Sequence, residues 1–138
     1  MFKTDKRTVT DFDAQRLQML IAAAHHPESG LYAWLEKLRS LLQEAERVRS
    51  EEIDPDCVTM NSRIRLQDTG SLETLVLTVV FPATAMKNPG KGFEQSDVSI
   101  LSPIGLSVLG RRAGDTICGR IRIADVLYQP EASGHYNL

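Results

Sequence analysis

The segment His25-His26-Pro27-Glu28 holds the closest grouping of metal-ligating residue types in the chain. Imidazole nitrogens and carboxylate oxygens both bind divalent metals. Adjacent histidines on a helix point in different directions, however, and no third ligand follows at a suitable spacing. We therefore interpret His25, His26 and Glu28 as part of a polar turn, and we predict neither a metal site nor a bound cofactor.

Candidate nucleophiles lack the partners that nucleophilic catalysis requires. The serines have no GxSxG turn around them, and Cys118 has no histidine in a position to act as its base. No GxxxxGK[ST] loop is present to bind phosphate. We predict no catalytic residue and expect that the protein is not an enzyme.

A second candidate site is cationic. Arg111 and Arg112 follow a predicted short helix, and Arg120 and Arg122 are close in sequence. Such a cluster is most often a solvated edge. The functional alternative is a docking edge, formed by Arg111 and Arg112, for an acidic partner surface. Trp34 lies in an apolar stripe and is predicted to belong to the core.

Composition limits the classes of function. The chain has 138 residues, of which 42% are hydrophobic and 25% charged, as in a soluble globular protein. Its net charge of −2 argues against strong stand-alone nucleic-acid binding. Two widely spaced cysteines indicate reduced thiols in the cytosol. With neither a signal peptide nor an apolar run that could span a membrane, we expect a cytoplasmic monomer without membrane contact.

The stretch from Val98 to Asp115 predicts a strand followed directly by a short helix. Ser102 is suited to cap the helix, and Pro103 at its first position has no N–H to satisfy. Ile104 and Val108 lie one turn apart, which predicts a common buried face. Gly110 is suited to the left-handed conformation that ends a helix.

The N-terminal third predicts two helices. A polar lead-in over residues 1–9 precedes a first helix that begins at Thr10 or Asp11. After the break around Pro27 and Gly30, leucines and other apolar residues recur every three or four positions from Leu31 to Val48. We predict an antiparallel helical hairpin, a short coiled coil, as an N-terminal domain over residues 1–50.

The remaining chain, residues 51–138, predicts a second domain. Strict alternation over residues 58–67 predicts a half-buried strand, and a hairpin turn leads to a more central strand over 72–81. Residues 82–94 predict a surface loop, and 117–129 the last strand region, with either a tight turn or a bulge at Gly119. The predicted fold class is α+β, with an antiparallel sheet and one short helix beside the helical hairpin.

The segment SPIGLSVLGRRAGD, from Ser102 to Asp115, resembles the C-terminal domain of the bacterial transcript-cleavage factors GreA and GreB. In that family a strand, Ser/Pro, a short helix, "LG", a basic residue and "GD" recur in this order. The segments VTMNSRIRL and VLYQPEASG, with the step Phe81-Pro82, are more similar still to the Rnk branch of the family, the regulators of nucleoside diphosphate kinase. The resemblance runs from about Thr10 to the end of the chain.

The resemblance implies an FKBP-like C-terminal domain and RNA polymerase as the partner. Gre factors dock with this domain near the rim of the polymerase secondary channel and push their coiled coil inward. Two acidic residues at the tip then help hold a metal at which water attacks the RNA, since Mg²⁺ prefers carboxylate oxygens. The fold similarity does not by itself imply prolyl isomerase activity.

Two departures from the Gre pattern point away from RNA cleavage. The predicted hairpin is short, and its tip, which would face the channel, offers Glu28 with His25 and His26 in place of a carboxylate pair. We therefore expect a regulator of transcription elongation that occupies the same channel without cleavage and competes with Gre factors. The alternatives are a Gre-type cleavage cofactor that uses Glu28, and a regulator of nucleoside diphosphate kinase acting by direct contact or through kinase expression.

Overall fold

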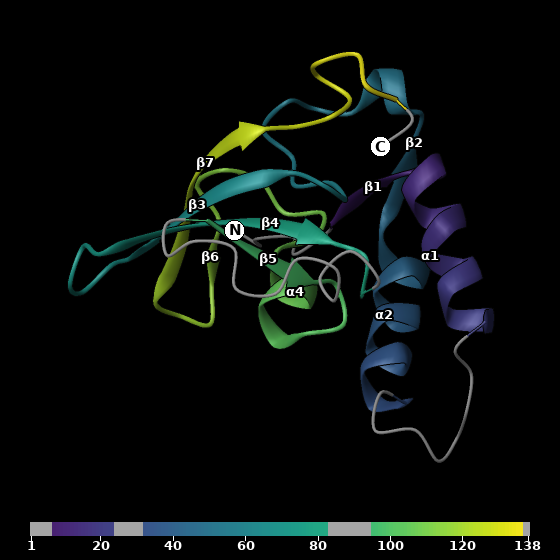
Figure 1. The fold of residues 1–138 in the computed structure, drawn as a ribbon, viewed down its shortest axis with the longest axis horizontal. Coiled ribbons are helices and arrows are strands. Elements are labelled where there is room, and N and C mark those ends of the chain that lie inside the picture. Colours follow the sequence, from purple (N-terminus) through teal and green to yellow (C-terminus); the bar gives the residue numbers. More distant parts are fainter. Residues whose placement is uncertain (1–6, 24–31, 83–94, 137–138) are drawn as a thin grey trace, which may run out of the picture.

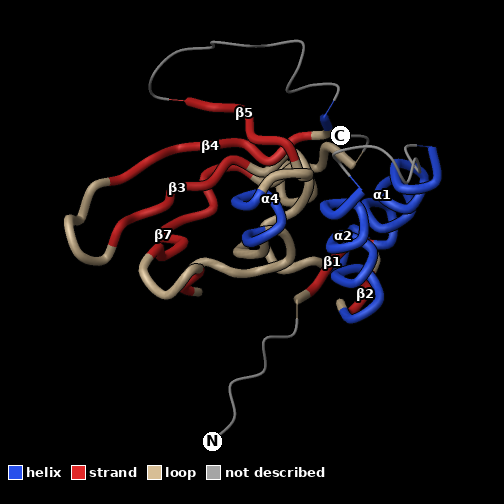
Figure 2. The backbone as a smooth tube through the Cα atoms, turned by 90° about the horizontal axis from the view of Figure 1, so that it is seen from below, coloured by secondary structure: helices blue, strands red, loops and turns tan. Residues whose placement is uncertain are grey.

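The computed structural model describes residues 7–23, 32–82 and 95–136. Two helices stand at one end of a curled sheet, and a short third helix lies between the sheet and those two helices (Figures 1 and 2). This is a mixed α+β fold, as predicted. Among the described residues, no helix is long and apolar enough to cross a membrane.

The two N-terminal helices are α1 (Asp11–Ala23) and α2 (Tyr32–Glu44). The predicted start of α1 is confirmed, because the Asp13 N–H donates to Thr10 Oγ1 at 3.0 Å. Apolar residues at helical spacing are buried in the common core; they are Leu17 and Ile21 on α1, and Leu35, Leu38 and Leu42 on α2. The predicted tip, with His25, His26 and Glu28, lies outside the described residues.

The second helix is shorter than its apolar stripe predicted. It ends at Glu44, and the strand β2 (Glu46–Val48) pairs in parallel with β1 (Thr8–Thr10). The lead-in therefore contributes a buried strand, in which Val9 is 1% exposed. Backbone hydrogen bonds to the segment of β1 replace those of another helical turn. Just before β1, the Arg7 carbonyl accepts the Glu46 N–H at 2.8 Å.

The sheet contains five strands in the order β5-β4-β3-β7-β6. Their bounds are β3 (Arg63–Asp68), β4 (Thr74–Val80), β5 (Gln95–Ser99), β6 (Thr116–Ile117) and β7 (Ile121–Tyr128). Central β3 is antiparallel to both β4 and β7. The prediction of an antiparallel sheet was wrong at one edge, because β5 runs parallel to β4. Residues 81–94 give the connection the length that a parallel crossover needs.

The predicted strand over 58–67 begins only at Arg63. Its first part is a buried turn, in which a side-chain hydroxyl accepts one backbone N–H. Thr59 N–H donates to Ser62 Oγ at 2.9 Å, and the two hydroxyl oxygens lie 2.8 Å apart. Asn61 within this turn has a φ of 66°. The alternating apolar residues are buried. The end of the turn already bonds to β4, because Asn61 N–H donates to Val79 O at 2.6 Å and Val79 N–H donates to Ser62 O at 3.1 Å.

The short helix α4 (Pro103–Val108) has the predicted ends. Ser102 Oγ accepts the Gly105 N–H at 3.1 Å, Pro103 stands at the first turn, and Gly110 follows the C-cap with a φ of 81°. Its buried face differs from the prediction: Val108 is buried, but Ile104 is 37% exposed. Leu106 and Gly105 take the inward positions, since Gly105 sits directly against the end of β5.

Backbone hydrogen bonds connect the first strand with the segment after α4. Thr8 N–H donates to Gly110 O at 3.0 Å, and Gly110 N–H donates to Val58 O at 2.9 Å. Val58 N–H in turn donates to Arg111 O at 2.8 Å. The short 3-10 helix η1 (Ser50–Glu52) leads from β2 toward this junction. One continuous core of buried residues runs from α1 and α2 into the sheet.

We predict that Gly105→Ala lowers the free energy of unfolding by about 2 kcal/mol or more. A Cβ at this position would collide with the Ser99 carbonyl oxygen and lie 2.9 Å from Ile100 Cα, and both are backbone atoms. Urea unfolding measures the loss. Gly70→Ala, where the nearest atom is the Asp68 side chain at 3.3 Å, is the control and should change stability by less than about 0.5 kcal/mol. Equal stability of Gly105→Ala and the wild type would contradict this packing.

Candidate partner-docking site

The helices are attached to the sheet through Asp13, a carboxylate that is only 1% exposed. Its Oδ2 accepts the Met60 N–H at 3.0 Å, and its Oδ1 lies 2.6 Å from Arg16 Nη2. Burial raises the pKa of Asp13, and the contacts with Arg16 and Met60 act in the opposite direction. The first turn of α1 is thereby fixed against the turn that precedes β3.

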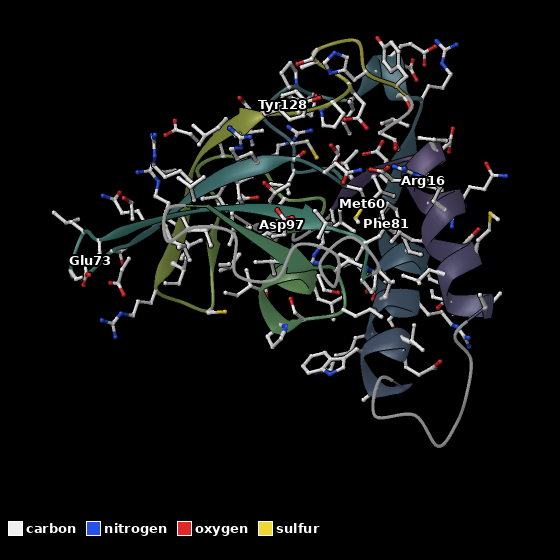
Figure 3. The ribbon with its side chains drawn as sticks, viewed as in Figure 1. Arg16, Met60, Glu73, Phe81, Asp97 and Tyr128 are labelled. Atoms are coloured by element: carbon white, nitrogen blue, oxygen red, sulfur yellow. The ribbon has the colours of Figure 1, made fainter. Side chains whose placement is uncertain are left out.

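Arg16 completes the attachment with cation–π contacts. Its guanidinium carbon lies 4.1 Å from the ring centroid of Phe12 and 4.8 Å from that of Phe81, which follows β4. Figure 3 shows Arg16, Met60 and Phe81 together where α1 meets the sheet. Cation–π contacts of this kind are worth about 0.5–1 kcal/mol at exposed positions and more when desolvated.

Glu131 is the second buried carboxylate at this junction. It follows β7 and is 6% exposed, and its Oε1 accepts the Thr59 hydroxyl at 2.8 Å. Burial raises the pKa of Glu131; the hydrogen bond from Thr59 lowers it, and nearby Asp13 raises it further. Glu131 and Asp13 therefore hold the first two residues of the 59–62 turn, Thr59 and Met60.

The sequence contained a signal for Asp13 that our prediction did not use. Asp13 precedes Leu17 and Ile21 by one and two helical turns, so it shares their buried face. A carboxylate on a buried helix face requires hydrogen-bond donors from another element. For Glu131 no spacing gives this information, because the residue lies in a turn after the last strand.

The two arginines of the predicted docking edge diverge. Arg111 is partly buried, and its Nε donates to the Ser107 carbonyl at 2.9 Å. Arg112 is exposed, and its Nη1 lies 3.7 Å from Asp54 Oδ2. The Arg112 backbone N–H donates to Asp115 Oδ2 at 2.9 Å. The structure thus places Arg111 against α4, whereas Arg112 faces the segment that precedes β3.

An apolar hollow of about 330 Å³ lies between the sheet and the start of α4. Exposed Leu75 and Ile104 line it together with Ile121 and Cys118. Cys118, in the tight turn between β6 and β7, has a φ of 54°, and Gly119 beside it has a φ of 70°. Exposed apolar groups gathered in one place are typical of protein-interaction surfaces.

The described part of the chain includes neither the predicted tip nor a cluster of metal-ligating residues. His25, His26 and Glu28 lie outside the described residues. Within residues 7–23, 32–82 and 95–136, no three side chains of the metal-ligating types cluster. The described candidate surfaces are therefore the Arg111–Arg112 edge, the apolar hollow, and a groove between α2 and α4 considered below.

Comparison with known proteins identifies the family. The family model described as "Transcription elongation factor, GreA/GreB, C-term" matches residues 53–121, which include the whole of α4 and β3 to β6. The chain belongs to this family, which confirms the resemblance seen in its sequence. The membership defines the class of the protein as a relative of transcription elongation factors.

A particular relative is similar over nearly the full length. The regulator of nucleoside diphosphate kinase from Escherichia coli K12 is 31% identical over 141 aligned residues, covering 94% of this chain and 95% of the relative. The solved structure of a "prokaryotic transcription elongation factor GreA/GreB" from Nitrosomonas europaea is 34% identical, with a TM-score of 0.70. That match covers 91% of this chain and all of the other. The transcription inhibitor protein Gfh1 of Thermus aquaticus is 31% identical over 78% of this chain and 62% of its own length.

We predict that Glu131→Gln makes the protein more stable at pH 7. Because the pKa of Glu131 is raised in the folded protein, the stability that its neutral form contributes is present at low pH and is lost as the pH rises through that pKa. Glutamine keeps an oxygen for the Thr59 hydroxyl without the charge. The advantage of the variant should shrink as the pH falls below the raised pKa.

Chemical unfolding of both proteins at several pH values from 4 to 7.5 measures this difference. Glu73→Gln, which removes an exposed carboxylate just before β4, is the matched control. A stability difference for Glu131→Gln that is independent of pH would contradict the assigned burial effect.

Proposed function

We propose that this protein binds RNA polymerase and regulates transcription elongation, docking near the secondary channel without stimulating RNA cleavage and competing with Gre factors. The observation that carries the proposal is membership of the GreA/GreB family together with similarity over 94% of the chain to a relative named as a regulator. A second relative is named a transcription inhibitor, and none of these names describes an enzyme.

The length of the helices supports a role without cleavage. Each described helix, α1 and α2, has 13 residues, which at 1.5 Å per residue gives about 20 Å. The sequence between them offers one carboxylate, Glu28, where a metal-holding tip needs two. A hairpin of this size would enter a channel without presenting a Gre-type carboxylate pair.

The docking surface belongs to the C-terminal part of the chain in this proposal. The proposal divides the chain into a hairpin domain over residues 1–50 and an FKBP-like domain over residues 51–138. The curled sheet with α4 against it is consistent with that description. The exposed Arg112 of the Arg111–Arg112 edge supplies a charge for an acidic partner, and the apolar hollow at Ile104 supplies contact area.

We predict that the purified protein leaves the length of RNA unchanged in a stalled, backtracked elongation complex. It should also reduce cleavage by an added Gre factor as its concentration increases, because both would occupy one entry. Gel analysis of the transcript measures both effects. Shortening of the RNA by this protein alone would contradict the proposal and favour a cleavage cofactor that uses Glu28. Absence of binding to core polymerase at low salt would exclude both roles.

A second prediction concerns Arg112. Arg112→Ala should weaken binding to core polymerase about two- to fivefold at low salt, as expected for an exposed charge. The difference should disappear at high salt, where exposed charges are screened. Arg122→Ala, which removes another exposed cation on β7, is the control and should bind like the wild type. Equal loss in both variants would show that overall charge, and not the Arg111–Arg112 edge, determines the affinity.

Regulation of nucleoside diphosphate kinase is a second candidate function, favoured by the name of the full-length relative. A direct mode predicts a complex between this protein and the kinase. Size-exclusion chromatography of the two purified proteins tests it, and separate elution at micromolar concentrations would count against direct contact. An effect through kinase expression would instead depend on polymerase binding.

A further inference from the structure

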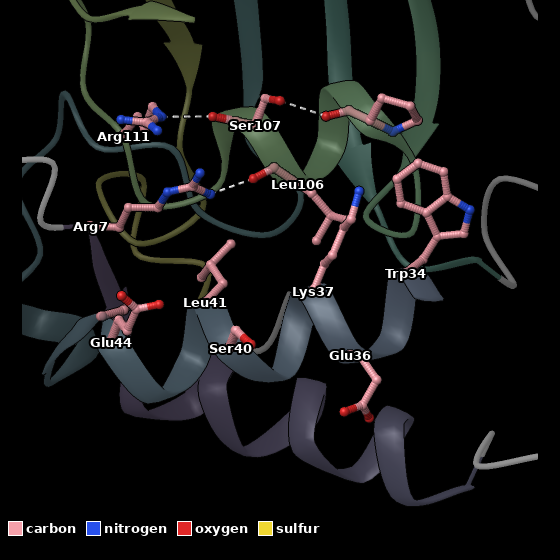
Figure 4. Close-up of a pocket in the computed structure, with 12 residues that line it drawn as sticks. Arg7, Trp34, Glu36, Lys37, Ser40, Leu41, Glu44, Leu106, Ser107 and Arg111 are labelled. Atoms are coloured by element: carbon pink, nitrogen blue, oxygen red, sulfur yellow. Dashed lines mark hydrogen bonds between the residues drawn. The ribbon is translucent and has the colours of Figure 1, made fainter. Parts of the chain in front are cut away.

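A groove of about 880 Å³ separates α2 from α4. One wall is the face of α2 that does not pack on α1, with Trp34, Lys37 and Leu41 at helical spacing. The opposite wall is formed by Pro103, Leu106 and Ser107 of α4 and continues to Arg111 and Arg7. Figure 4 shows Arg7 and Lys37 directed from opposite walls toward Leu106.

Three cations and two carboxylates are among the described residues that line the groove. Arg7, Lys37 and Arg111 come from three separate segments of the chain. The acidic lining residues are Glu36 and Glu44, but Glu36 is directed away from α4 and lies 3.3 Å from Arg39. Of the two lining carboxylates, Glu36 is thus the one that pairs with a cation outside the groove, Arg39.

The two guanidinium groups are held in place by α4. Arg7 Nη1 donates to the Leu106 carbonyl, and Arg111 Nε donates to the Ser107 carbonyl at 2.9 Å. These carbonyls belong to the last turn of the helix, where intrahelical partners are missing and cations are favoured. A guanidinium fixed in this way loses little further side-chain entropy when it binds an anion.

The apolar lining shows that more than an inorganic anion would fit. Trp34, Leu41, Ala45, Pro103 and Leu106 contribute apolar surface between the cations. Lys37 Nζ lies 4.7 Å from the centre of the Trp34 ring, so charge and aromatic surface are adjacent. A volume of this size matches that of typical small-molecule sites. The large exposed hydrophobic residues of the described chain, among them Leu75 and Ile104, lie outside this groove. A protein partner that binds through apolar contacts would therefore find more exposed apolar surface at those residues than in the groove.

We propose that the groove between α2 and α4 binds a phosphorylated small molecule of the nucleotide class. The phosphate groups would lie between Lys37 and the two α4-bound arginines, since guanidinium and ammonium groups are the usual donors to phosphate. The ring would contact the apolar surface around Trp34 and Leu41. Because such a ligand touches both walls, its binding would add contacts between the helices and the sheet. The inference is independent of polymerase docking.

Trp34 is the only tryptophan in the chain, so its fluorescence reports on the groove. We expect sodium tripolyphosphate to change this fluorescence saturably, and ATP to bind more tightly than tripolyphosphate in isothermal titration calorimetry without added metal. Adenosine, which lacks phosphate, should bind weakly or not at all. ATP should also raise the unfolding temperature of the full chain, because it binds only the folded state.

Lys37→Gln and Arg111→Gln should each weaken ATP binding about tenfold, as expected for loss of a charge-assisted hydrogen bond. Arg47→Gln is the control, because it removes one exposed cation on β2 at a position outside the groove. Circular dichroism and the unfolding temperature without ligand verify that each variant folds. Absence of saturable ATP binding at 1 mM, or equal loss in all three variants, would overturn the proposal. Equal affinity for tripolyphosphate and ATP would refute the contact with the ring.

Discussion

Asp13 is the side chain on which the relative placement of helices and sheet depends. It joins α1 to the turn before β3 through the Met60 N–H, and it holds Arg16 between two phenylalanine rings. A buried carboxylate is costly unless donors surround it, so this position is stable in essentially one arrangement. The contact specifies where α1 lies more than it adds net stability.

That constraint has consequences at a distance. With α1 fixed by Asp13 and α2 packed on α1, the free face of α2 is directed toward α4 and forms one wall of the groove. The opposite wall is fixed independently, because Gly105 brings α4 against β5 and Gly110 joins the segment after it to β1 and Val58. The groove therefore lies between two rigidly held elements, which is the condition for a preorganised binding site.

Much of the fold could be predicted from local patterns. The cap at Ser102, the turn at Gly110, the start of α1 and the strands β4 and β7 follow from the chemistry of neighbouring residues. The errors share a physical cause. β2 replaced the end of a predicted helix, and the 58–62 turn replaced the start of a predicted strand, because hydrogen-bond partners far away in the sequence competed with the local periodicity. These partners are β1 for β2, and the carboxylates of Asp13 and Glu131 for the turn.

The family, the α+β class and the basic residues at 111 and 112 were determined by the sequence itself, since each depends on residue identity and short-range order. Only the tertiary structure decided that Arg111 and Arg112 diverge, that Trp34 borders a groove, and that Arg7 from the polar lead-in joins it. These placements depend on which chain segments approach across the core. That approach is governed by buried contacts such as Asp13 with Met60, between residues nearly fifty positions apart.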